Sequence, residues 1–184
     1  MKRILLAGPA VEPVTLAEAK AHLRIDADDE DDLVGALIVA ARVAAETEIR
    51  RVMIEQSWRA VVEGWPAAGV ELPVQPALSV DAVRAVDADG AATPLDEEDY
   101  AFDISDGSVE LINPVTGTKH YEIDFSAGYG VAGADVPQPL RQAILMLVTH
   151  WHEHRSAITD GENAAATPLG VRELIAPYRR TSLC

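Results

Sequence analysis

The order of apolar and polar residues predicts two helices near the start of the chain. Thr15 precedes the first helix and Glu18 follows three residues later, which is the spacing of a Thr-x-x-Glu capping box. Apolar residues then recur at helical spacing over 16–23, and a longer helix is predicted over about 29–53. The apolar face predicted for the longer helix comprises Leu33, Leu37, Ala41, Ala44, Ala45, Ile49 and Val52. Its alanines permit close packing, so we expect neighbours on more than one side.

An acidic segment separates the two helices. Six of the seven residues from Asp26 to Asp32 are Asp or Glu. Carboxylates at a helix start meet the positive end of the helix dipole. Hard cations also prefer carboxylate oxygens, but this run lacks the alternating ligands and central glycine of an EF-hand loop. We therefore interpret the segment first as the start of the second helix.

Residues 54–130 have a different pattern, with frequent Pro and Gly and short runs typical of β-strands. The predicted strands are Ser57–Gly64, Val70–Leu72, Val80–Val86, Tyr100–Ile104, Val109–Ile112 and Tyr121–Ser126. Asp106-Gly107 lies between two of these runs and predicts a hairpin turn. Because the strands are short and follow one another closely, we expect a small antiparallel sheet or sandwich.

Helical periodicity returns over 137–155, with Asp135 as a candidate cap. The apolar face of this helix is Leu140, Ile144, Leu147, Val148 and Trp151. A polar loop follows over 156–167, and Pro168 opens a short helical segment that ends near Pro177. The predicted fold is α+β: a helical body from residues 14–53 plus 137–184, with a β-domain inserted at 54–130.

Charge and composition narrow the classes of function. A net charge of −15 argues against unaided binding to nucleic acid or to an anionic membrane surface. The single cysteine, Cys184, cannot form an internal disulfide. The apolar run after Lys2 and Arg3 is shorter than a signal peptide needs, and no run approaches the ~20 apolar residues of a membrane span. We expect a soluble intracellular protein.

Two motifs suggest chemistry without completing it. Gly128, Gly130 and Gly133 match G-x-G-x-x-G, but Pro137 and Pro139 place the next helix too late for a dinucleotide site. We interpret the motif as a turn, and we expect no cofactor.

The histidines His150, His152 and His154 lie at the end of the third long helix. His150 and His154 share a face, as zinc ligands do, but H-E-x-x-H is not matched and the sequence offers no third ligand nearby. No Gly-x-Ser-x-Gly elbow is present either. An alternative function is a small metal-dependent enzyme that uses the His150/His154 helix end. We expect no catalytic residue and no bound metal, and we interpret the histidines as a polar helix end.

The whole pattern resembles the phage head–tail connector (adaptor) proteins found in tailed phages, prophages and gene transfer agents. The resemblance begins with VTLAEAKAHLRID, the acidic run and LVGALIVAARVAAETEIRR, and continues through ELPVQPALSVDAVRAV and FSAGYG. It extends over VPQPLRQAILMLVTHWHEHR to PLGVRELIAPYRR, in the same order along nearly the full chain.

The resemblance implies a structural protein without enzymatic activity. It implies a ring of twelve subunits at the head–tail junction of a virion, made in the bacterial cytoplasm. The ring would bind the portal protein on one side and a tail-side connector or stopper protein on the other, with DNA passing through and no specific DNA contact. An assembly factor that leaves the mature particle is a further possibility.

The resemblance also implies two functional surfaces. The portal-docking interface would comprise Leu169, Val171, Leu174, Ile175, Tyr178, Arg179 and Arg180. The candidate acidic lumen would comprise Asp28, Asp29, Glu30, Asp31 and Asp32. A negatively charged channel wall would repel DNA phosphates.

Overall fold

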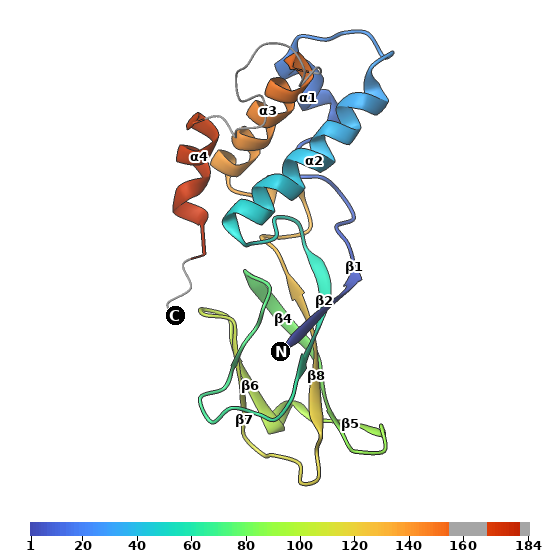
Figure 1. The fold of residues 1–184 in the computed structure, drawn as a ribbon, viewed down its shortest axis with the longest axis vertical. Helices are drawn as coiled ribbons and strands as arrows, with labels where there is room; N and C mark the ends of the chain where they lie inside the picture. Colours follow the sequence, from blue (N-terminus) through green and yellow to red (C-terminus); the bar gives the residue numbers. More distant parts are fainter. Residues whose placement is uncertain (155–168, 181–184) are drawn as a thin grey trace. The chain divides into compact units, whose positions relative to one another are not determined.

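The computed structural model describes residues 1–154 and 169–180. The chain forms two compact units, and each unit combines two segments of the chain. The β-rich unit comprises Met1–Ala10 and Glu55–Tyr129, and the helical unit comprises Val11–Ile54 and Gly130–Cys184. Helices and antiparallel strands are both present, which confirms the predicted α+β class (Figure 1). The first ten residues, which were assigned to neither predicted domain, belong to the β-rich unit.

The helical unit contains four α-helices among its described residues. They are α1 (Leu16–Leu23), α2 (Asp31–Ile49), α3 (Gln138–Glu153) and α4 (Leu169–Ile175), with short 3-10 turns η2 (Gly133–Asp135) and η3 (Ala176–Tyr178). The predicted capping box is present: the Glu18 amide donates to Thr15 Oγ1 at 3.2 Å, and the Thr15 amide donates to Glu18 Oε2 at 2.9 Å. Arg24 ends α1 and Arg50 ends α2, each in the left-handed backbone region. This tight ending after α1 leaves the acidic segment to start α2.

The core of the helical unit lies where α2 and α3 pack together, with α1 against both of these helices and α4 against α3. The buried apolar residues of α2 and α3 are Val34, Ile38, Ala41, Ala45, Ile49, Leu140, Ala143, Ile144, Leu147 and Val148. Full burial of a valine, isoleucine or leucine side chain stabilises the fold by about 1.5–3 kcal/mol. The face predicted for α2 is therefore partly wrong, because Leu33 is exposed, and Leu37 and Ala44 are only half-buried. The helix is rotated so that Val34 and Ile38 point inward.

A buried arginine joins α2 to the neighbouring chain segments within the helical unit. Arg42 is 8% exposed, and its Nε donates to Glu12 Oε2 while its Nη1 donates to Glu46 Oε2, both at 2.8 Å. Glu46 Oε1 accepts a hydrogen bond from the Met53 amide at 2.8 Å. Burial raises the pKa of Glu46 above its ordinary value, although the Met53 amide and Arg42 favour the charged form. Arg42 thus neutralises a carboxylate that few water molecules reach.

The β-rich unit contains two antiparallel sheets. The five-stranded sheet has the order β1-β2-β8-β4-β5, and the three-stranded sheet has the order β3-β7-β6. The strands are β1 (Lys2–Ala7), β2 (Gln56–Val62), β3 (Val70–Glu71), β4 (Ala77–Val86), β5 (Ala92–Pro94), β6 (Tyr100–Asp103), β7 (Ser108–Leu111) and β8 (His120–Ala127), and η1 (Glu97–Asp99) is a 3-10 turn. The hairpin predicted at Asp106-Gly107 is confirmed, with Gly107 at φ +71° between β6 and β7. The sequence did not predict β1 and β5, the two edge strands of the five-stranded sheet.

The core of the β-rich unit is formed by the inward side chains of both sheets. Those with at most 1% exposure include Ala60, Leu72, Val83, Val109, Ile123 and Phe125. Trp65 meets Tyr121 edge to face, with ring centroids 5.0 Å apart, which ties the segment before β3 to the central strand β8. None of the described helices is long and apolar enough to cross a membrane.

Candidate functional site

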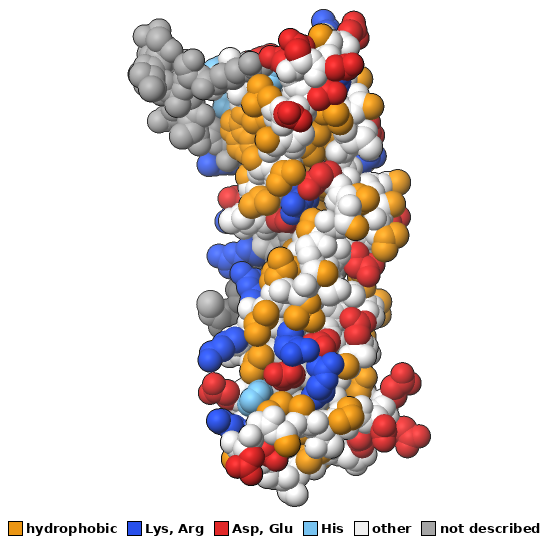
Figure 2. All heavy atoms as spheres, turned by 90° about the vertical axis from the view of Figure 1, so that its right-hand side faces the viewer, with side chains coloured by type: hydrophobic (Ala, Val, Ile, Leu, Met, Phe, Trp, Pro, Cys, Tyr) orange, Lys and Arg blue, Asp and Glu red, His pale blue; other side chains and the backbone are white. Residues whose placement is uncertain are grey.

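The acidic segment at the start of α2 is partly neutralised within its own unit. Lys20 Nζ lies 2.7 Å from Asp28 Oδ1 and 2.6 Å from Asp31 Oδ1, and hydrogen bonding to Lys20 lowers the pKa of Asp28. The side chains of Asp29 and Asp32 are exposed. Acidic side chains gather at the upper end of the face shown in Figure 2. Of the five candidate lumen acids, Asp28, Asp29 and Asp32 are exposed, and the charge of Asp28 is balanced by Lys20.

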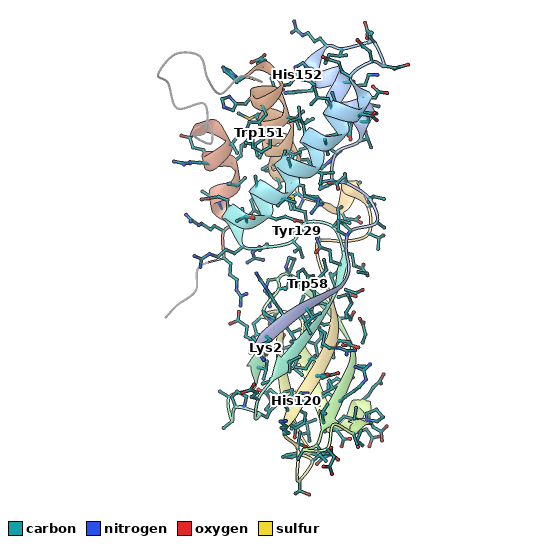
Figure 3. All side chains as sticks on the ribbon, turned by 45° about the vertical axis from the view of Figure 1, so that its right-hand side comes forward. Lys2, Trp58, His120, Tyr129, Trp151 and His152 are labelled. Atoms are coloured by element: carbon teal, nitrogen blue, oxygen red, sulfur yellow. The ribbon has the colours of Figure 1, made fainter. Side chains whose placement is uncertain are left out.

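Glu30, the fifth candidate acid, lies beside the histidines of α3. His152 Nε2 is 2.9 Å from Glu30 Oε2, and Figure 3 shows His152 and Trp151 on α3. The rings of His150 and His154 lie 4.7 Å apart between centroids. The residues that the structure describes contain no group of three His, Cys, Asp or Glu side chains able to hold a metal ion. The geometry thus ties the end of α3 to the start of α2 and offers no support for the metal-dependent alternative.

The glycine-rich segment before α3 shapes the backbone of the helical unit. A Cβ on Gly133 would lie only 2.7 Å from the carbonyl oxygen of Pro13, so the two chain segments approach too closely for any side chain. Asp135 accepts a hydrogen bond from the Ala132 amide at 2.9 Å, and Pro137 precedes α3 as its cap residue. The prediction that Asp135 caps α3 is therefore wrong, because its side chain closes the η2 turn instead.

The side of α2 that faces away from α3 is apolar and uncharged. We call it the outward face of α2. Its exposed residues are Leu33, Ala36, Val39, Ala40, Val43 and Thr47, flanked by the half-buried Leu37 and Ala44. Val39 and Val43 are 42% and 48% exposed. An extended neutral face on a chain with a net charge of −15 is the type of surface that proteins bury against a partner.

The predicted portal-docking residues fall into two groups. Val171 and Ile175 are 0% and 3% exposed, because α4 packs on α3 within the helical unit. Leu174, Tyr178 and Arg180 are half-buried, and Arg179 is exposed. Leu169 begins α4. Burial within the unit therefore leaves fewer of these predicted residues accessible than the sequence indicated.

The end of this segment is held beside the end of α2. The Arg180 amide donates to the carbonyl oxygen of Ile49 at 2.9 Å, and Arg179 Nη2 lies 3.5 Å from Glu48 Oε1. A shallow groove of about 380 Å³ lies there, lined by Glu48, Ile49, Arg172, Ile175, Ala176 and Arg179. Its two arginines make it a basic feature on an acidic chain.

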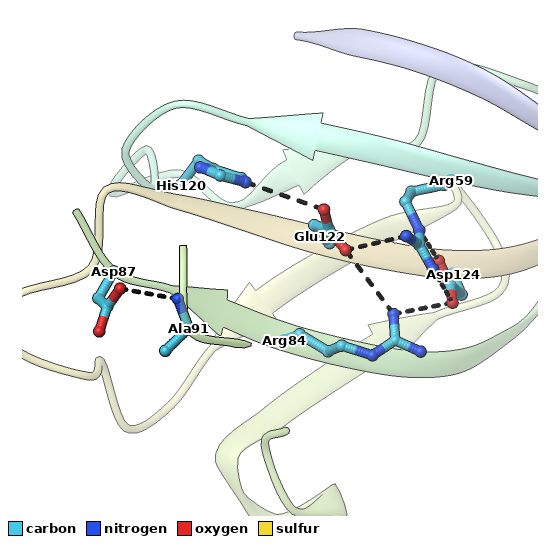
Figure 4. Close-up of polar contacts among 7 residues, drawn as sticks. All are labelled: Arg59, Arg84, Asp87, Ala91, His120, Glu122 and Asp124. Carbon is cyan, nitrogen blue, oxygen red and sulfur yellow. Dashed lines mark hydrogen bonds and ion pairs between the residues drawn. The ribbon is translucent and has the colours of Figure 1, made fainter. Parts of the chain in front are cut away.

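In the β-rich unit, an ion-pair network crosses one face of the five-stranded sheet (Figure 4). Asp124 accepts hydrogen bonds from Arg59 Nε at 2.6 Å and from Arg84 Nη1 at 2.8 Å, and Arg59 also lies 3.1 Å from Glu122. Hydrogen bonding from Arg59, with a further contribution from Arg84, lowers the pKa of Asp124 against the opposing effect of burial. The network links the side chains of β2, β8 and β4, which are the three inner strands of the sheet.

The described residues form buried cores, ion pairs and an exposed apolar helix face, and they contain no group of three side chains able to hold a metal ion. The family model for head completion proteins matches residues 12–181, so the chain belongs to the head completion protein family. None of the curated proteins compared with the chain matches it significantly. The family and the solved relatives are structural components of the head–tail junction, which confirms the interpretation as a structural adaptor rather than an enzyme.

Solved structures of gene transfer agent particles contain chains similar to this one. A chain in the neck of an empty particle, computed with C6 symmetry, is 28% identical with a TM-score of 0.81, and the match covers 100% of this chain and 98% of that one. A chain in the native virion is 27% identical with a TM-score of 0.81, covering 100% and 98%. A chain in the native neck with C12 symmetry is 29% identical with a TM-score of 0.75, covering 98% and 97%.

Proposed function

We propose that this protein is the head–tail adaptor of a phage-like particle, forming a twelve-subunit ring between the portal and the tail through which DNA passes. The observation that carries the proposal is the similarity to chains in an empty particle's neck and in a native virion. Each match covers 100% of this chain and 98% of the other chain. The matched native neck was computed with C12 symmetry and the matched empty neck with C6 symmetry, and the C12 reconstruction supports the number of subunits. The tail-side partner would be a connector or stopper protein.

The outward face of α2 supports the ring. Copies of a chain with a net charge of −15 repel one another, so a close contact between two copies requires faces on which acidic groups do not meet one another. The outward face of α2 meets this requirement from Leu33 to Thr47. Because a ring contact joins two different surfaces, this face would bury against another part of the neighbouring subunit.

Docking to the portal would use the end of α4 and η3. Val171 and Ile175 are buried within the unit, so their role would be to hold the segment in place. Arg172, Arg179 and the groove beside Glu48 would then meet acidic groups on the portal. The exposed acids Asp29 and Asp32 remain candidates for the channel wall, where they would repel DNA in transit.

Co-sedimentation of the purified chain with purified portal rings tests the proposal. Deleting the segment from residue 168 onward would uncover α3 where Val171 and Ile175 pack, so point substitutions are the sharper test. We expect Arg172→Glu/Arg179→Glu to weaken binding by about tenfold, as loss of about 1.4 kcal/mol would.

The matched control is Arg24→Glu/Lys119→Glu, which reverses two exposed basic residues outside the groove and should bind like the unmodified chain. A chain that does not sediment with portal rings would contradict the proposal. Equal binding by both variants would contradict the assigned docking surface.

A further inference from the structure

The two edges of the five-stranded sheet carry opposite charges. Strand β1 forms one edge, and residues 1–10 contain Lys2 and Arg3 but no acidic residue. Strand β5 forms the other edge, and the segment around it, residues 87–99, contains no Lys or Arg. Its acidic residues are Asp87, Asp89, Asp96, Glu97, Glu98 and Asp99. Lys2, Arg3, Glu97 and Glu98 are all exposed.

The basic edge is also unusually apolar. All six residues of β1 are exposed, and Ile4, Leu5 and Leu6 are each 48–49% exposed. Successive side chains of a strand point to opposite sides, so apolar groups emerge on both sides of β1. Within the described residues, β1 pairs with β2 alone, and its other side presents unpaired backbone groups. Such an edge promotes unwanted pairing unless something covers it.

The two edges are aligned with each other across the sheet. The register places Lys2 opposite Val61, Val61 opposite Glu122, Glu122 opposite Arg84, and Arg84 opposite Pro94. One row of residues thus runs from the basic edge to the acidic edge. Its length is about 19 Å, from four spacings of about 4.8 Å. Two copies placed side by side would bring Lys2 of one copy to the level of Pro94 of the next, two residues before the acidic run at 96–99.

From this arrangement we infer that the basic β1 edge of one subunit docks against the acidic edge around β5 and η1 of the next subunit. A closed ring needs two different, complementary surfaces on every subunit, and opposite edges of one sheet provide them. The contact would cover Ile4 and Leu6 and pair Lys2 and Arg3 with the acids of residues 96–99. This inference rests on the proposed ring and adds a contact between the β-rich units to the one proposed for α2.

Zero-length carbodiimide cross-linking of assembled particles that contain this chain tests the inference. The reagent joins an amine to a carboxylate only where the two are in contact. Lys2 lies on β1, and the acids at 96–99 follow β5 at the other edge of the sheet. A link between them that is found in species of twice the chain mass and not in the single chain therefore joins two copies. We expect a species of twice the chain mass in which a Lys2 peptide is linked to the peptide containing Glu97 and Glu98.

Particles in which Lys2 is linked only to another protein, or is not linked at all, would overturn the inference while leaving the proposed function intact. Absence of the chain from the particles would overturn the proposed function and, with it, the inference.

A charge-swap series gives a second readout. Lys2→Glu/Arg3→Glu should raise the concentration needed for half-maximal assembly on portal rings about tenfold, and adding Glu97→Lys/Glu98→Lys should restore it to within about threefold. The control Glu110→Lys/Glu153→Lys changes the net charge equally at exposed sites elsewhere and should not rescue. Rescue by the control as effective as that by the swap would overturn the edge-to-edge contact.

Discussion

Replacing Arg42 with methionine should destabilise the helical unit strongly, because it leaves a buried carboxylate without its cation. Methionine fills much of the same volume but donates no hydrogen bond. Glu46, whose side chain is 12% exposed, then keeps only the hydrogen bond from the Met53 amide. Glu12, at 28% exposure, is better hydrated and suffers less.

The expected loss can be estimated from these exposures. Removing one partner of a fully buried ion pair costs about 3–5 kcal/mol, and partial hydration of the trio places Arg42→Met near the lower end, at about 3 kcal/mol. A chain of this size loses about 2–4 °C in Tm per kcal/mol, so we expect a decrease of about 6–12 °C.

The pH dependence identifies the cause of the loss. Burial already raises the pKa of Glu46, and losing Arg42 raises it further. The folded variant then holds a proton that the unfolded chain releases. Its stability deficit should therefore be small below the ordinary glutamate pKa of about 4.3 and grow as the pH rises through the folded-state pKa. The second substitution Glu46→Gln should recover part of the loss at pH 7.

Urea unfolding followed by circular dichroism at 222 nm measures this unit specifically, because α1 to α4 all belong to it. Arg172→Met, at an exposed helical arginine, is the matched control and should change stability by less than about 0.5 kcal/mol. A deficit for Arg42→Met below about 1 kcal/mol, or one of equal size at pH 4.5 and pH 7, would refute the reasoning.

Three further outcomes follow from single contacts. Thr15→Ala removes the cap of α1 and should cost about 1 kcal/mol by the same assay, with Thr15→Ser close to the unmodified chain. Gly133→Ala forces two backbone segments apart and should cost about 1–3 kcal/mol, detected as a lower Tm. Because its pKa is lowered, chiefly by Arg59, Asp124 contributes stability above its ordinary pKa of about 3.9 and loses it as the pH falls through the folded-state value. Asp124→Asn should therefore be destabilised by about 1–2 kcal/mol at pH 7, and the difference from the unmodified chain should shrink as the pH falls through the folded-state pKa, in acid titrations of unfolding.

The helices could be predicted from the sequence, but the orientation of α2 could not. Apolar residues occupy most positions from Leu33 to Ala45, so periodicity alone does not distinguish the inward from the outward side. Packing against α3 selects Val34 and Ile38 and leaves Leu33 exposed. Because α2 is apolar both toward α3 and away from it, its sequence predicts a second packing surface.

The edge strands were missed for a different physical reason. Residues 2–7 do not alternate between apolar and polar, so their pattern does not predict a half-buried strand. Strand β5 has only three residues, and one of them is Pro94. Both strands exist because β2 and β4 offer them pairing partners, which are distant in sequence for β1. The sequence predicted that the acidic segment starts α2. Its ion pairs with Lys20 could not be predicted, because they depend on the tight turn at Arg24. The local sequence pattern does not predict such contacts, because they form only when the turn brings the two segments together.

Cryo-electron microscopy of the neck of particles that contain this chain is the most direct test of the head–tail adaptor assignment. The account predicts a ring of twelve copies between the portal and the tail, with the end of α4 on the portal side and the outward face of α2 buried against a neighbouring copy. The account would be contradicted if a different protein occupied that position in the neck, or if this chain were present there as a single copy and not as a ring.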